Sequence, residues 1–339
     1  MRAVSDTHDT RGDQGGTAER RGGGGTAGHA GDSERDLIAA LLAGEVAGLG
    51  RDVPLAPFTA YKVGGPAEFL AEAPSSAALV HAVAAGRAAG VPVTVLGQAT
   101  NVLVRDGGVS GLVVLARSSA WTVADDMLDC EAGAVLGEVV LDLAERGCAG
   151  LEFAGNIPGS VGGAVVGNAG AYGRAVADVV IDVSLLRLDG RVASVEPAAL
   201  ELGYRTSLLK ARRTSPLAGA VVLGARFRLQ PGVRTALLDE IARDAALRRS
   251  KHPLEYASCG SYFKNPSSDM PAARYIEQAG LKGLTVGRAQ VSERHANFLV
   301  ALAGARAGDI LALAEEVKRR VLEHCGVALE EEVVRLGVD

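Results

Sequence analysis

A glycine-rich stretch, residues 153–173, constrains this chain more than any other part of the sequence. It carries seven glycines from Gly155 onward and no charged side chain. Glycine at this density lets the backbone adopt positive φ and pass close to a partner, at an entropic cost on folding. Free N–H groups of such a segment can face phosphate oxygens. A flexible linker would be polar, whereas Phe153, Ile157 and Val161 are interleaved here, so we predict a packed, shaped segment.

Two common nucleotide-binding motifs are excluded for this stretch. It is not a P-loop, because no Gly-Lys-Ser/Thr follows it. It is not a Rossmann fingerprint either, because Pro158 interrupts it and no βαβ helix pattern comes after it. Any phosphate contact here would therefore need a different loop architecture.

Bulk composition limits the class of protein. With 339 residues and 48% hydrophobic content, the chain can bury two or three packed units. A net charge of −5 does not point to nucleic acid or to an anionic membrane surface. Four cysteines without a Cys-x-x-Cys pair argue against a disulfide framework or a metal site and fit a reducing compartment. No apolar run approaches the ~18 residues of a membrane span, and no signal peptide is evident, so we expect a cytoplasmic protein.

The order of predicted elements indicates an α+β fold. Residues 1–32 hold little that could repay their ordering entropy and should be disordered. Ser33 is a candidate N-cap for a helix that runs to Gly48. Strands and helices then mix without regular βαβ alternation and without internal repeats. The pair Asp189-Gly190, between two apolar runs, is the strongest hairpin signal in the chain.

Three small-residue turns each close a predicted strand: residues 63–65, residues 97–101 and the glycine-rich stretch. Three such loops could converge on one flat, anionic ligand, which would be a cofactor. They could equally be three unrelated turns, and spacing alone does not decide between the two interpretations.

Three polar residues stand out in loops but are ambiguous when each is taken singly. Arg205 lies in a polar break between sheet elements, where a surface salt bridge is the usual role. Ser261 lies between Gly260 and Tyr262 and has the character of a turn serine. Glu332 belongs to a run of three glutamates that could simply be solvated.

Seven motifs along the chain, in this order, resemble the family of UDP-N-acetylenolpyruvoylglucosamine reductases. The resemblance begins near Phe58 and extends to the C-terminal end of the sequence. Seven motifs in the family's order are far more specific than any one glycine loop. The motifs are Val-Gly-Gly-Pro-Ala (63–67), Leu-Gly-Gln-Ala-Thr-Asn (96–101), Ile-Pro-Gly-Ser-Val-Gly-Gly-Ala with Asn-Ala-Gly-Ala-Tyr-Gly (157–173), Gly-Tyr-Arg-Thr-Ser (203–207), Gly-Ser-Tyr-Phe-Lys-Asn-Pro (260–266), Ala-Gln-Val-Ser-Glu-Arg-His-Ala-Asn (289–297) and Leu-Glu-Glu-Glu-Val (329–333).

The resemblance implies a fold and a domain order. It implies an α+β fold with an FAD-binding domain of the p-cresol methylhydroxylase/vanillyl-alcohol oxidase type over residues 33–230. This domain would consist of two α+β subdomains, at about 33–116 and 117–230. A C-terminal α+β substrate-binding domain would follow at residues 231–339.

The resemblance also implies an activity. The enzyme would hold FAD non-covalently, take electrons from NADPH and reduce the enolpyruvyl ether of a UDP sugar to UDP-N-acetylmuramate, a precursor of peptidoglycan. The implied setting is cell wall biogenesis, with its links to cell shape, cell division and the cell cycle. The implied partners are these small molecules, with no nucleic acid and no membrane, and the sequence leaves the oligomeric state open.

The matching motifs imply roles for single residues. Arg205 corresponds to the family's catalytic arginine, Ser261 to its proton donor and Glu332 to its catalytic glutamate. The substrate-contacting positions of the family match Lys251, Asn265 and the neighbourhood of His295. The cofactor-contacting positions match Tyr61, Val63, Gly64, Gly65, Gly97, Thr100, Asn101, Ile157, Gly159, Ser160, Gly162, Gly163, Ala164, Asn168, Gly170, Ala171 and Tyr172.

These residue types suit the implied chemistry. Hydride from reduced flavin would reach the vinyl carbon of the enolpyruvyl ether, and negative charge would develop beside the carboxylate. A guanidinium such as that of Arg205 stabilises such charge, and a hydroxyl such as that of Ser261 can protonate the adjacent carbon. Glu332 could orient this centre or share a proton with it, while the flavin carries the redox chemistry.

Several positions depart from the family's motifs. The second flavin loop has Ala99 and Thr100 where the family usually has Gly-Ser, Arg288 stands where a glycine is usual, and Ala301 stands where Asn is common. The direct passage from an Arg-rich predicted helix to Lys251 resembles the branch without a substrate-capping tyrosine loop. A paralogue that reduces a related enolpyruvyl nucleotide is therefore an alternative.

Two further alternatives come from other classes. A flavin oxidase of the same superfamily would use O₂ and often anchors its flavin covalently through His or Cys. Apart from His81, inside a predicted helix, no histidine lies near the first two loops. A non-catalytic flavin- or nucleotide-binding protein would have no need of Arg205, Ser261 and Glu332 in their motifs.

Overall fold

The computed structural model describes residues 27–210, 215–267 and 269–339. The chain divides into two compact units, Met1–Ile38 and Ala39–Asp339, and every sheet belongs to the second.

Helix α1 (Ala27–Glu45) begins earlier than predicted. The expected start was Ser33, after a disordered tail over residues 1–32, and this boundary was wrong. Alanine has the highest helix propensity, so Ala27 and Ala30 favour an earlier start. The rest of the predicted tail, residues 1–26, lies outside the described residues.

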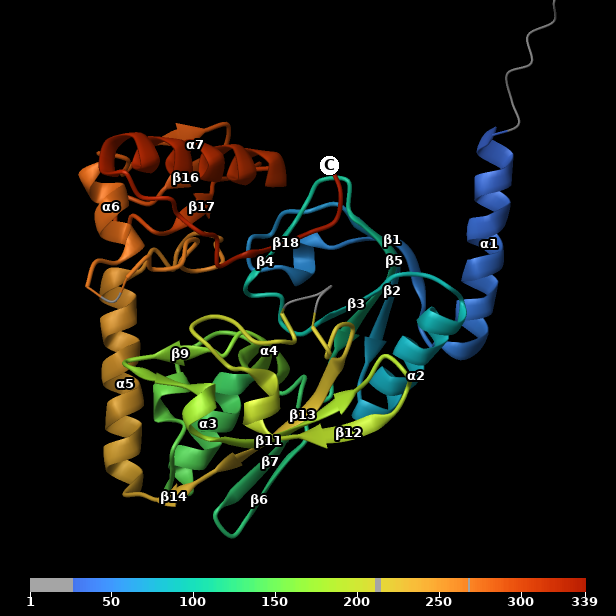
Figure 1. Ribbon diagram of the computed structural model, residues 1–339, viewed down its shortest axis with the longest axis horizontal. Helices are drawn as coiled ribbons and strands as arrows, with labels where there is room; N and C mark the ends of the chain where they lie inside the picture. The colour runs from blue at the N-terminus through green and yellow to red at the C-terminus, as the bar shows by residue number, and fades with distance from the viewer. Residues whose placement is uncertain (1–26, 211–214, 268) are drawn as a thin grey trace, which may run out of the picture. The chain divides into compact units, whose positions relative to one another are not determined.

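A mixed four-stranded sheet forms the first part of the second unit (Figure 1). Its order is β1–β2–β5–β3, with β1 antiparallel to β2 and with β2 and β3 parallel to β5. Residues 112–115 of β5 are fully buried, as the unbroken apolar run of a central strand requires. Helix α2 packs on β2 and β5. The bounds are β1 Gly50–Pro54, η1 Ala56–Phe58, β2 Pro66–Ala73, α2 Ser76–Ala88, β3 Val93–Leu96 and β5 Val109–Ala116.

An antiparallel five-stranded sheet, β12–β11–β13–β7–β6, forms the second part. The predicted hairpin at Asp189-Gly190 is confirmed, because it joins β11 to β12. Helix α4 packs on β13, and α5 packs on α3. The bounds are β6 Trp121–Ala124, β7 Met127–Glu131, α3 Leu136–Glu145, β8 Cys148–Ala149, η2 Glu152–Ala154, α4 Val161–Val166, β9 Gly170–Ala171, β10 Arg174–Ala175, η3 Val176–Asp178, β11 Val180–Leu186, β12 Val192–Val195, η4 Pro197–Leu200, β13 Val221–Arg228, β14 Gln230–Pro231 and α5 Arg234–Lys251.

A three-stranded antiparallel sheet with two helices forms the C-terminal part (Figure 1). The long helix α7 buries an apolar stripe that includes Ile310, Leu313, Val317 and Val321, spaced at three or four residues along one helical face. This stripe closes a hydrophobic core under the sheet. The bounds are α6 Ala272–Gln278, β15 Thr285–Val286, β16 Ala289–Val291, β17 Leu299–Ala301 and α7 Ala307–Cys325.

Two connections tie the C-terminal part to the first sheet region. Strand β18 (Val334–Leu336) pairs in parallel with β4 (Val102–Val104), which directly follows the second glycine loop. Tyr61 and Leu103 belong to the hydrophobic core that α7 closes. The last strand therefore carries the residues before it, Glu332 included, to the loops of the N-terminal half.

The mixed helices and strands confirm the α+β prediction. The three sheets have separate hydrophobic cores, one for each part. Among the described helices, none has the length and apolar content that crossing a bilayer requires.

Candidate active site

The three small-residue loops lie against one another. The Thr100 hydroxyl donates to the carbonyl O of Pro158 at 3.0 Å, which joins the second loop to the glycine-rich stretch. The N–H of Ala60, three residues before the first loop, donates to the carbonyl O of Ala99 at 3.3 Å, which joins the approach to the first loop to the second loop. A Cβ added to Gly97 would collide with the hydroxyl of Ser160, so this close approach needs glycine.

Two of these loops present backbone N–H groups that the protein does not use. Within the described part of the chain, the N–H groups of Gln98, Ala99 and Thr100 donate no hydrogen bond, and neither do those of Gly159 and Ser160. Consecutive free N–H groups in a turn form a concavity that suits an anion. The two loops therefore fit the phosphates of a bound nucleotide such as FAD.

The start of helix α4 does not offer such groups, although the sequence expectation included it. The N–H of Val161 donates to the carbonyl O of Ala134 at 3.0 Å, and that of Gly162 to the carbonyl O of Ala132 at 2.8 Å. The N–H of Gly163 donates to the N-cap hydroxyl of Ser160. A Cβ added to Gly162 would lie only 2.9 Å from the Cβ of Ala132, so glycine at this position allows α4 to pack closely on the turn after β7.

Two other expected cofactor contacts have side chains that the protein itself uses. Tyr61 is fully buried, and its hydroxyl donates to the carbonyl O of Leu299 at 3.0 Å, so only its backbone is left for a cofactor. Asn168 donates through Nδ2 to the carbonyl O of Gly203 at 2.9 Å and accepts from the N–H of Ala177. Asn168 thus fixes the glycine-rich stretch to the loop that carries Arg205.

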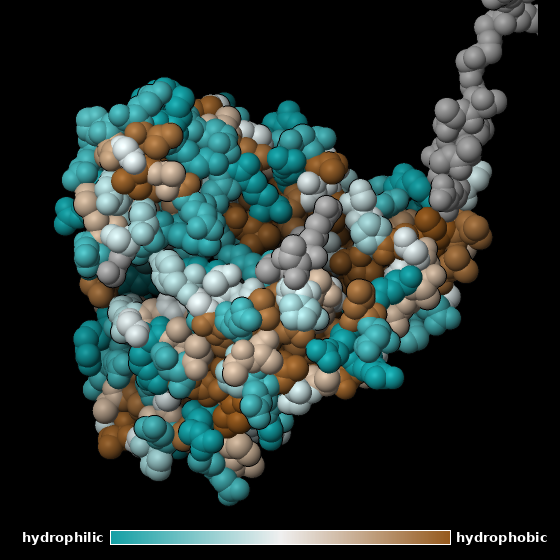
Figure 2. Space-filling model, in the orientation of Figure 1, coloured by the Kyte–Doolittle hydropathy of each residue, from teal (hydrophilic) through white to brown (hydrophobic). Residues whose placement is uncertain are grey.

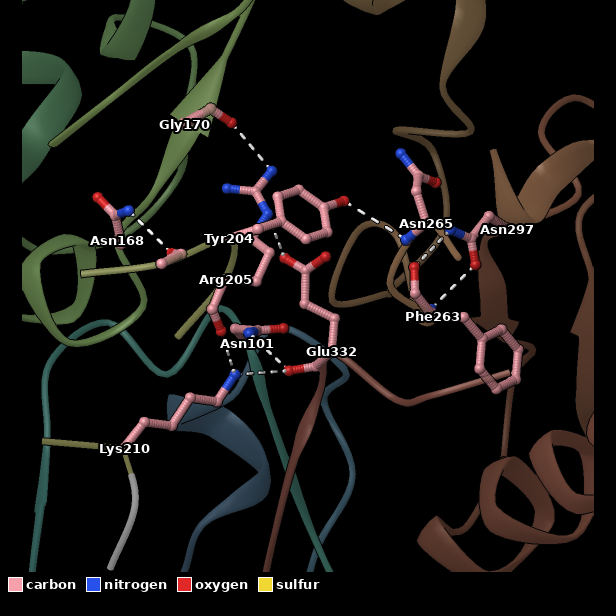
Figure 3. A network of polar contacts seen from close by, with 11 residues as sticks. Asn101, Asn168, Gly170, Tyr204, Arg205, Lys210, Phe263, Asn265, Asn297 and Glu332 are labelled. Carbon is pink, nitrogen blue, oxygen red and sulfur yellow. Dashed lines mark hydrogen bonds and ion pairs between the residues drawn. The ribbon is translucent and has the colours of Figure 1, made fainter. Parts of the chain in front are cut away.

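Arg205 and Glu332 form an ion pair where these segments meet. The Nε of Arg205 is 3.0 Å from Oε1 of Glu332, and the two side chains are only 26% and 16% exposed. Arg205 also donates through Nη2 to the carbonyl O of Gly170 at 2.9 Å, as Figure 3 shows. Its backbone is left-handed, with φ of 56°, inside a turn closed by Gly203 and Thr206. Two expected catalytic residues, far apart in sequence, are thus in contact.

Glu332 is held by its main chain. Its N–H donates to the carbonyl O of Tyr262 at 2.8 Å. Its carbonyl O accepts from Nδ2 of Asn101 at 3.2 Å and from Nζ of Lys210 at 3.4 Å, as Figure 3 shows. Burial raises the pKa of its carboxyl, while Arg205, Lys210 and Lys264 act in the opposite direction.

Ser261 lies beside the residue that anchors Glu332. Its neighbour Tyr262 accepts the Glu332 N–H, and Phe263 forms an antiparallel bridge with Glu331. The half-buried hydroxyl of Ser261 makes no hydrogen bond within the described segments. All three expected catalytic residues therefore lie on backbone segments that are in contact. The Ser261 hydroxyl remains available as a hydrogen-bond donor within the described segments.

The expected substrate residues fall into two places. Asn265 lies near the ion pair, because its N–H donates to the hydroxyl of Tyr204 at 3.4 Å. Its Oδ1 also accepts from the first N–H of α6. Lys251, the exposed last residue of α5, and His295 lie instead around His252, whose ring centroid is 5.2 Å from that of His295. Among the described residues, no hydrogen bond or ion pair joins this histidine cluster to Arg205, so the structure does not bring all the expected substrate residues into one contact set.

Several functional candidates were missed in the sequence. Lys210 and Lys264 both act electrostatically on Glu332. Lys264 stands inside the same motif as Ser261, which could have singled it out. Tyr204 precedes Arg205, and its ring lies 5.8 Å from the guanidinium carbon. Asn297 clamps Phe263, accepting its N–H at 3.0 Å and donating to its carbonyl O at 2.8 Å.

The three residues that depart from the family's motifs lie in a loop, a turn and a strand, outside the Arg205–Glu332 ion pair. Ala99 has φ of 46°, a left-handed conformation that glycine adopts without cost. Arg288 is exposed in the turn between β15 and β16, and Ala301 pairs with Ala289 in the β16–β17 ladder. None of the three side chains lies in the ion pair of Arg205 and Glu332.

Three of the histidines and cysteines, the residue types that can bond a flavin covalently, are engaged or buried in the described structure. His81 lies in α2, where its Nε2 is 2.7 Å from the carbonyl O of Glu45. Cys259 is buried, burial raises the pKa of its thiol to about 12, and its Sγ lies 3.3 Å from the carbonyl O of Val102. Burial likewise raises the pKa of Cys130 to about 12.

The space-filling view shows a hollow between the region of α6 and α7 and the region of α4 and β9 (Figure 2).

Known proteins match the chain over most of its length. A model of the FAD binding domain matches residues 67–196, and a model of the UDP-N-acetylenolpyruvoylglucosamine reductase C-terminal domain matches residues 252–336. The flavin-binding match confirms the expected cofactor and flavin domain.

Three relatives extend these matches. A UDP-N-acetylenolpyruvoylglucosamine reductase of Rubrobacter xylanophilus is 49% identical over 84% of this chain and 94% of its own length. A UDP-N-acetylenolpyruvoylglucosamine reductase of Agathobacter rectalis is 41% identical over 86% of this chain and 94% of its own length. The crystal structure of the Thermus caldophilus enzyme aligns with a TM-score of 0.70 at 33% identity, over 85% of this chain and 99% of that one. The chain therefore belongs to the family of UDP-N-acetylenolpyruvoylglucosamine reductases.

Proposed function

We propose that this protein is an NADPH-dependent flavoenzyme that reduces the enolpyruvyl ether of UDP-N-acetylenolpyruvoylglucosamine to UDP-N-acetylmuramate. The observation that carries the proposal is the half-buried pair of Arg205 and Glu332, held at 3.0 Å beside Ser261-Tyr262 and the flavin loops. FAD, when bound, supplies the hydride for the vinyl carbon. The residues of the chain then have to bind the carboxylate, stabilise charge beside it and deliver one proton.

Arg205 is proposed to bind the enolpyruvyl carboxylate. Its Nε faces Glu332 and its Nη2 is bonded to Gly170, while its Nη1 donates no hydrogen bond to any described residue. A guanidinium fixed on two sides offers its free edge at a set angle, which suits a carboxylate and the charge that develops beside it. Glu332 is proposed to hold this orientation.

Ser261 is proposed to give the proton to the carbon next to the carboxylate. A general acid must reach the reacting atom with a free donor, and the Ser261 hydroxyl has no partner within the described segments. The clamp of Asn297 on Phe263 fixes the segment that carries it. This leaves Glu332 as a positioning group and Ser261 as the donor.

The loops around the ion pair are proposed to hold FAD. The free N–H groups of residues 98–100 and of Gly159 and Ser160 would face the phosphates. Asn265 is proposed to contact the substrate near Arg205, and Lys251 and His295 to contact its more distant phosphate-bearing portion, since Lys251 carries a positive charge that suits an anion.

The domain division stays a proposal as well. We propose an FAD-binding domain over residues 33–230, with subdomains at about 33–116 and 117–230, and a substrate-binding domain over residues 231–339. The separate hydrophobic cores of the three sheets support this division. We further propose that the enzyme works in the cytoplasm, in peptidoglycan synthesis, and so bears on cell shape, cell division and the cell cycle.

One experiment separates this function from its alternatives. The purified protein is reduced with NADPH without oxygen and then mixed with the UDP-enolpyruvyl sugar. The proposal expects flavin re-oxidation and a product heavier by two hydrogens. Re-oxidation only after oxygen is admitted would indicate an oxidase, and a flavin that NADPH never reduces would indicate a binding protein. Re-oxidation only by other enolpyruvyl nucleotides would indicate a paralogue.

A further inference from the structure

Lys210 is a polar group of the candidate site that the proposed mechanism does not use. Its Nζ donates to the carbonyl O of Arg205 at 3.2 Å and to that of Glu332 at 3.4 Å (Figure 3). These are the main chains of the two residues whose side chains form the ion pair. One ammonium group thus joins the backbones of both members of the pair.

The backbone of Arg205 has a conformation that its surroundings must hold. Its φ is 56°, and residues other than glycine keep such a conformation only when neighbouring contacts fix it. Hydrogen bonds between Gly203 and Thr206 close the turn around Arg205 on one side. Lys210 holds the carbonyl O of Arg205 on the other side.

Other polar side chains near the pair do not make this connection. Lys264 forms an ion pair with Glu330, at the rim of the site. Within the described part of the chain, Asn101 donates to the carbonyl O of Glu332 but makes no hydrogen bond to Arg205. Among the described side chains, Lys210 is the one that contacts both main chains of the pair.

We propose that Lys210 is a positioning residue for substrate reduction. It holds the main chains of Arg205 and Glu332 at one separation, so that guanidinium and carboxylate stay paired when a substrate carboxylate approaches. Its charge, close to Glu332, also favours the ionised form of that carboxyl. The inference rests on the proposed function and deepens it.

The charge of Lys210 gives the proposal a signature in pH. The groups that act on Glu332 are Arg205, Lys210 and Lys264, and all three lower its pKa against the effect of burial. The groups that act on Lys210 itself are Lys264, Glu332, Glu330 and Arg205. Removing the ammonium raises the pKa of Glu332 further. The limb of the pH profile that reports Glu332 therefore moves to higher pH, whichever form of the carboxyl is active.

The test measures flavin re-oxidation by the UDP-enolpyruvyl sugar after anaerobic reduction with NADPH. In Lys210→Met, NADPH reduces the flavin at nearly the wild-type rate. The maximal rate of re-oxidation falls roughly 10- to 100-fold, the scale expected for a misplaced reacting group, with little change in the half-saturating substrate concentration. Lys210→Arg restores most of the rate and brings the Glu332 limb of the pH profile back to its wild-type position. Lys210→Gln restores hydrogen bonding but leaves that limb at higher pH.

Lys318→Met is the matched control. Lys318 pairs with Glu315 at 2.8 Å and with Glu331, the neighbour of Glu332, at 3.1 Å, so its loss removes an ammonium nearby without touching either main-chain contact. It should lower stability and leave the pH limb in place. If Lys210→Met does not retain FAD, Lys210→Gln and Lys210→Arg carry the comparison.

Wild-type rates and an unmoved limb in the uncharged Lys210 variants would overturn the proposal, and so would an equal shift in Lys318→Met. A wild-type protein whose reduced flavin is not re-oxidised by the sugar would refute the proposed function first, and the role of Lys210 with it. If the sugar re-oxidises the wild-type flavin and the Lys210 variants re-oxidise at the same rate with the same pH profile, only the inference about Lys210 would be refuted.

Discussion

The Nε of Arg205 lies 3.0 Å from Oε1 of Glu332, although the two residues are far apart in the sequence. A lysine ammonium is a point charge on a flexible stem. It cannot contact both Glu332 and Gly170 and still present a fixed N–H donor to the substrate carboxylate. We expect Arg205→Lys to slow re-oxidation of reduced flavin by substrate about 10²–10³-fold and to leave reduction by NADPH nearly unchanged.

Arg226→Lys is the control for this change, because Arg226 forms a comparable pair with Asp182 in the second sheet. Stopped-flow absorbance of the flavin follows both half-reactions. Equal losses of re-oxidation in the two variants would mean that the effect is on stability and not on the site.

We expect the flavin to leave the protein on acid precipitation. His81 and Cys259 are engaged with backbone carbonyls, and Cys130 is buried with a pKa of about 12, so a covalent anchor has no free nucleophile among these residues. FAD should appear in the supernatant in a ratio near one per chain. Flavin absorbance that stays with the pellet would contradict this.

Ala99 marks a strained position in the second flavin loop. Its φ of 46° costs a residue with a Cβ about 1 kcal/mol. We expect Ala99→Gly to keep FAD and to unfold no more easily than the wild type in urea. Ala71→Gly in the buried strand β2 should instead lose about 1 kcal/mol or more. A loss at Ala99 as large as that at Ala71 would count against local strain.

His252 should make the fold sensitive to mild acid. Burial lowers its pKa from 6.5 to about 4, and His295, Arg248 and Lys251 act in the same direction. A lowered pKa in the folded state means that its stabilising contribution is present above pH 6.5 and is lost as the pH falls through about 4.

We expect His252→Phe, which keeps an aromatic ring beside His295 and Phe298, to flatten the dependence of Tm on pH between 6.5 and 4. The gain over wild type at the acid end should be about 1–2 kcal/mol, after discounting for solvent screening. His324→Phe, in the last turn of α7, is the control. Parallel profiles of Tm against pH for wild type and His252→Phe would contradict a role of His252 in the acid sensitivity.

Local patterns predicted much of the fold. The turn at Asp189-Gly190 follows from backbone preferences, which act over a few residues. The start of α1 was wrong because a candidate cap at Ser33 was given more weight than the alanines before it. Motifs, not periodicity, singled out Arg205, Ser261 and Glu332.

The contacts of the site could not be predicted in the same way. Lys210 reaches Glu332 only because β18 pairs with β4, and no local pattern encodes that pairing. The N–H groups at the start of α4 were expected to be free, but the carbonyl groups of Ala132 and Ala134, in the turn after β7, accept two of them. Tertiary packing decides which backbone groups of a glycine-rich stretch remain available.

The role of Ser261 tests the proposed reduction most directly. If Ser261 gives the proton after hydride has reached the substrate, Ser261→Ala should accept electrons from NADPH at nearly the wild-type rate. Its re-oxidation by the UDP-enolpyruvyl sugar should slow by ~10²–10⁴-fold, and Ser261→Cys should recover part of the loss, because a thiol can also donate a proton. Ser250→Ala, at the end of α5, is the control and should match the wild type. Stopped-flow measurement of the re-oxidation rate decides the matter: a slow Ser261→Ala with normal reduction by NADPH is the predicted result, and re-oxidation of Ser261→Ala at the wild-type rate would contradict it.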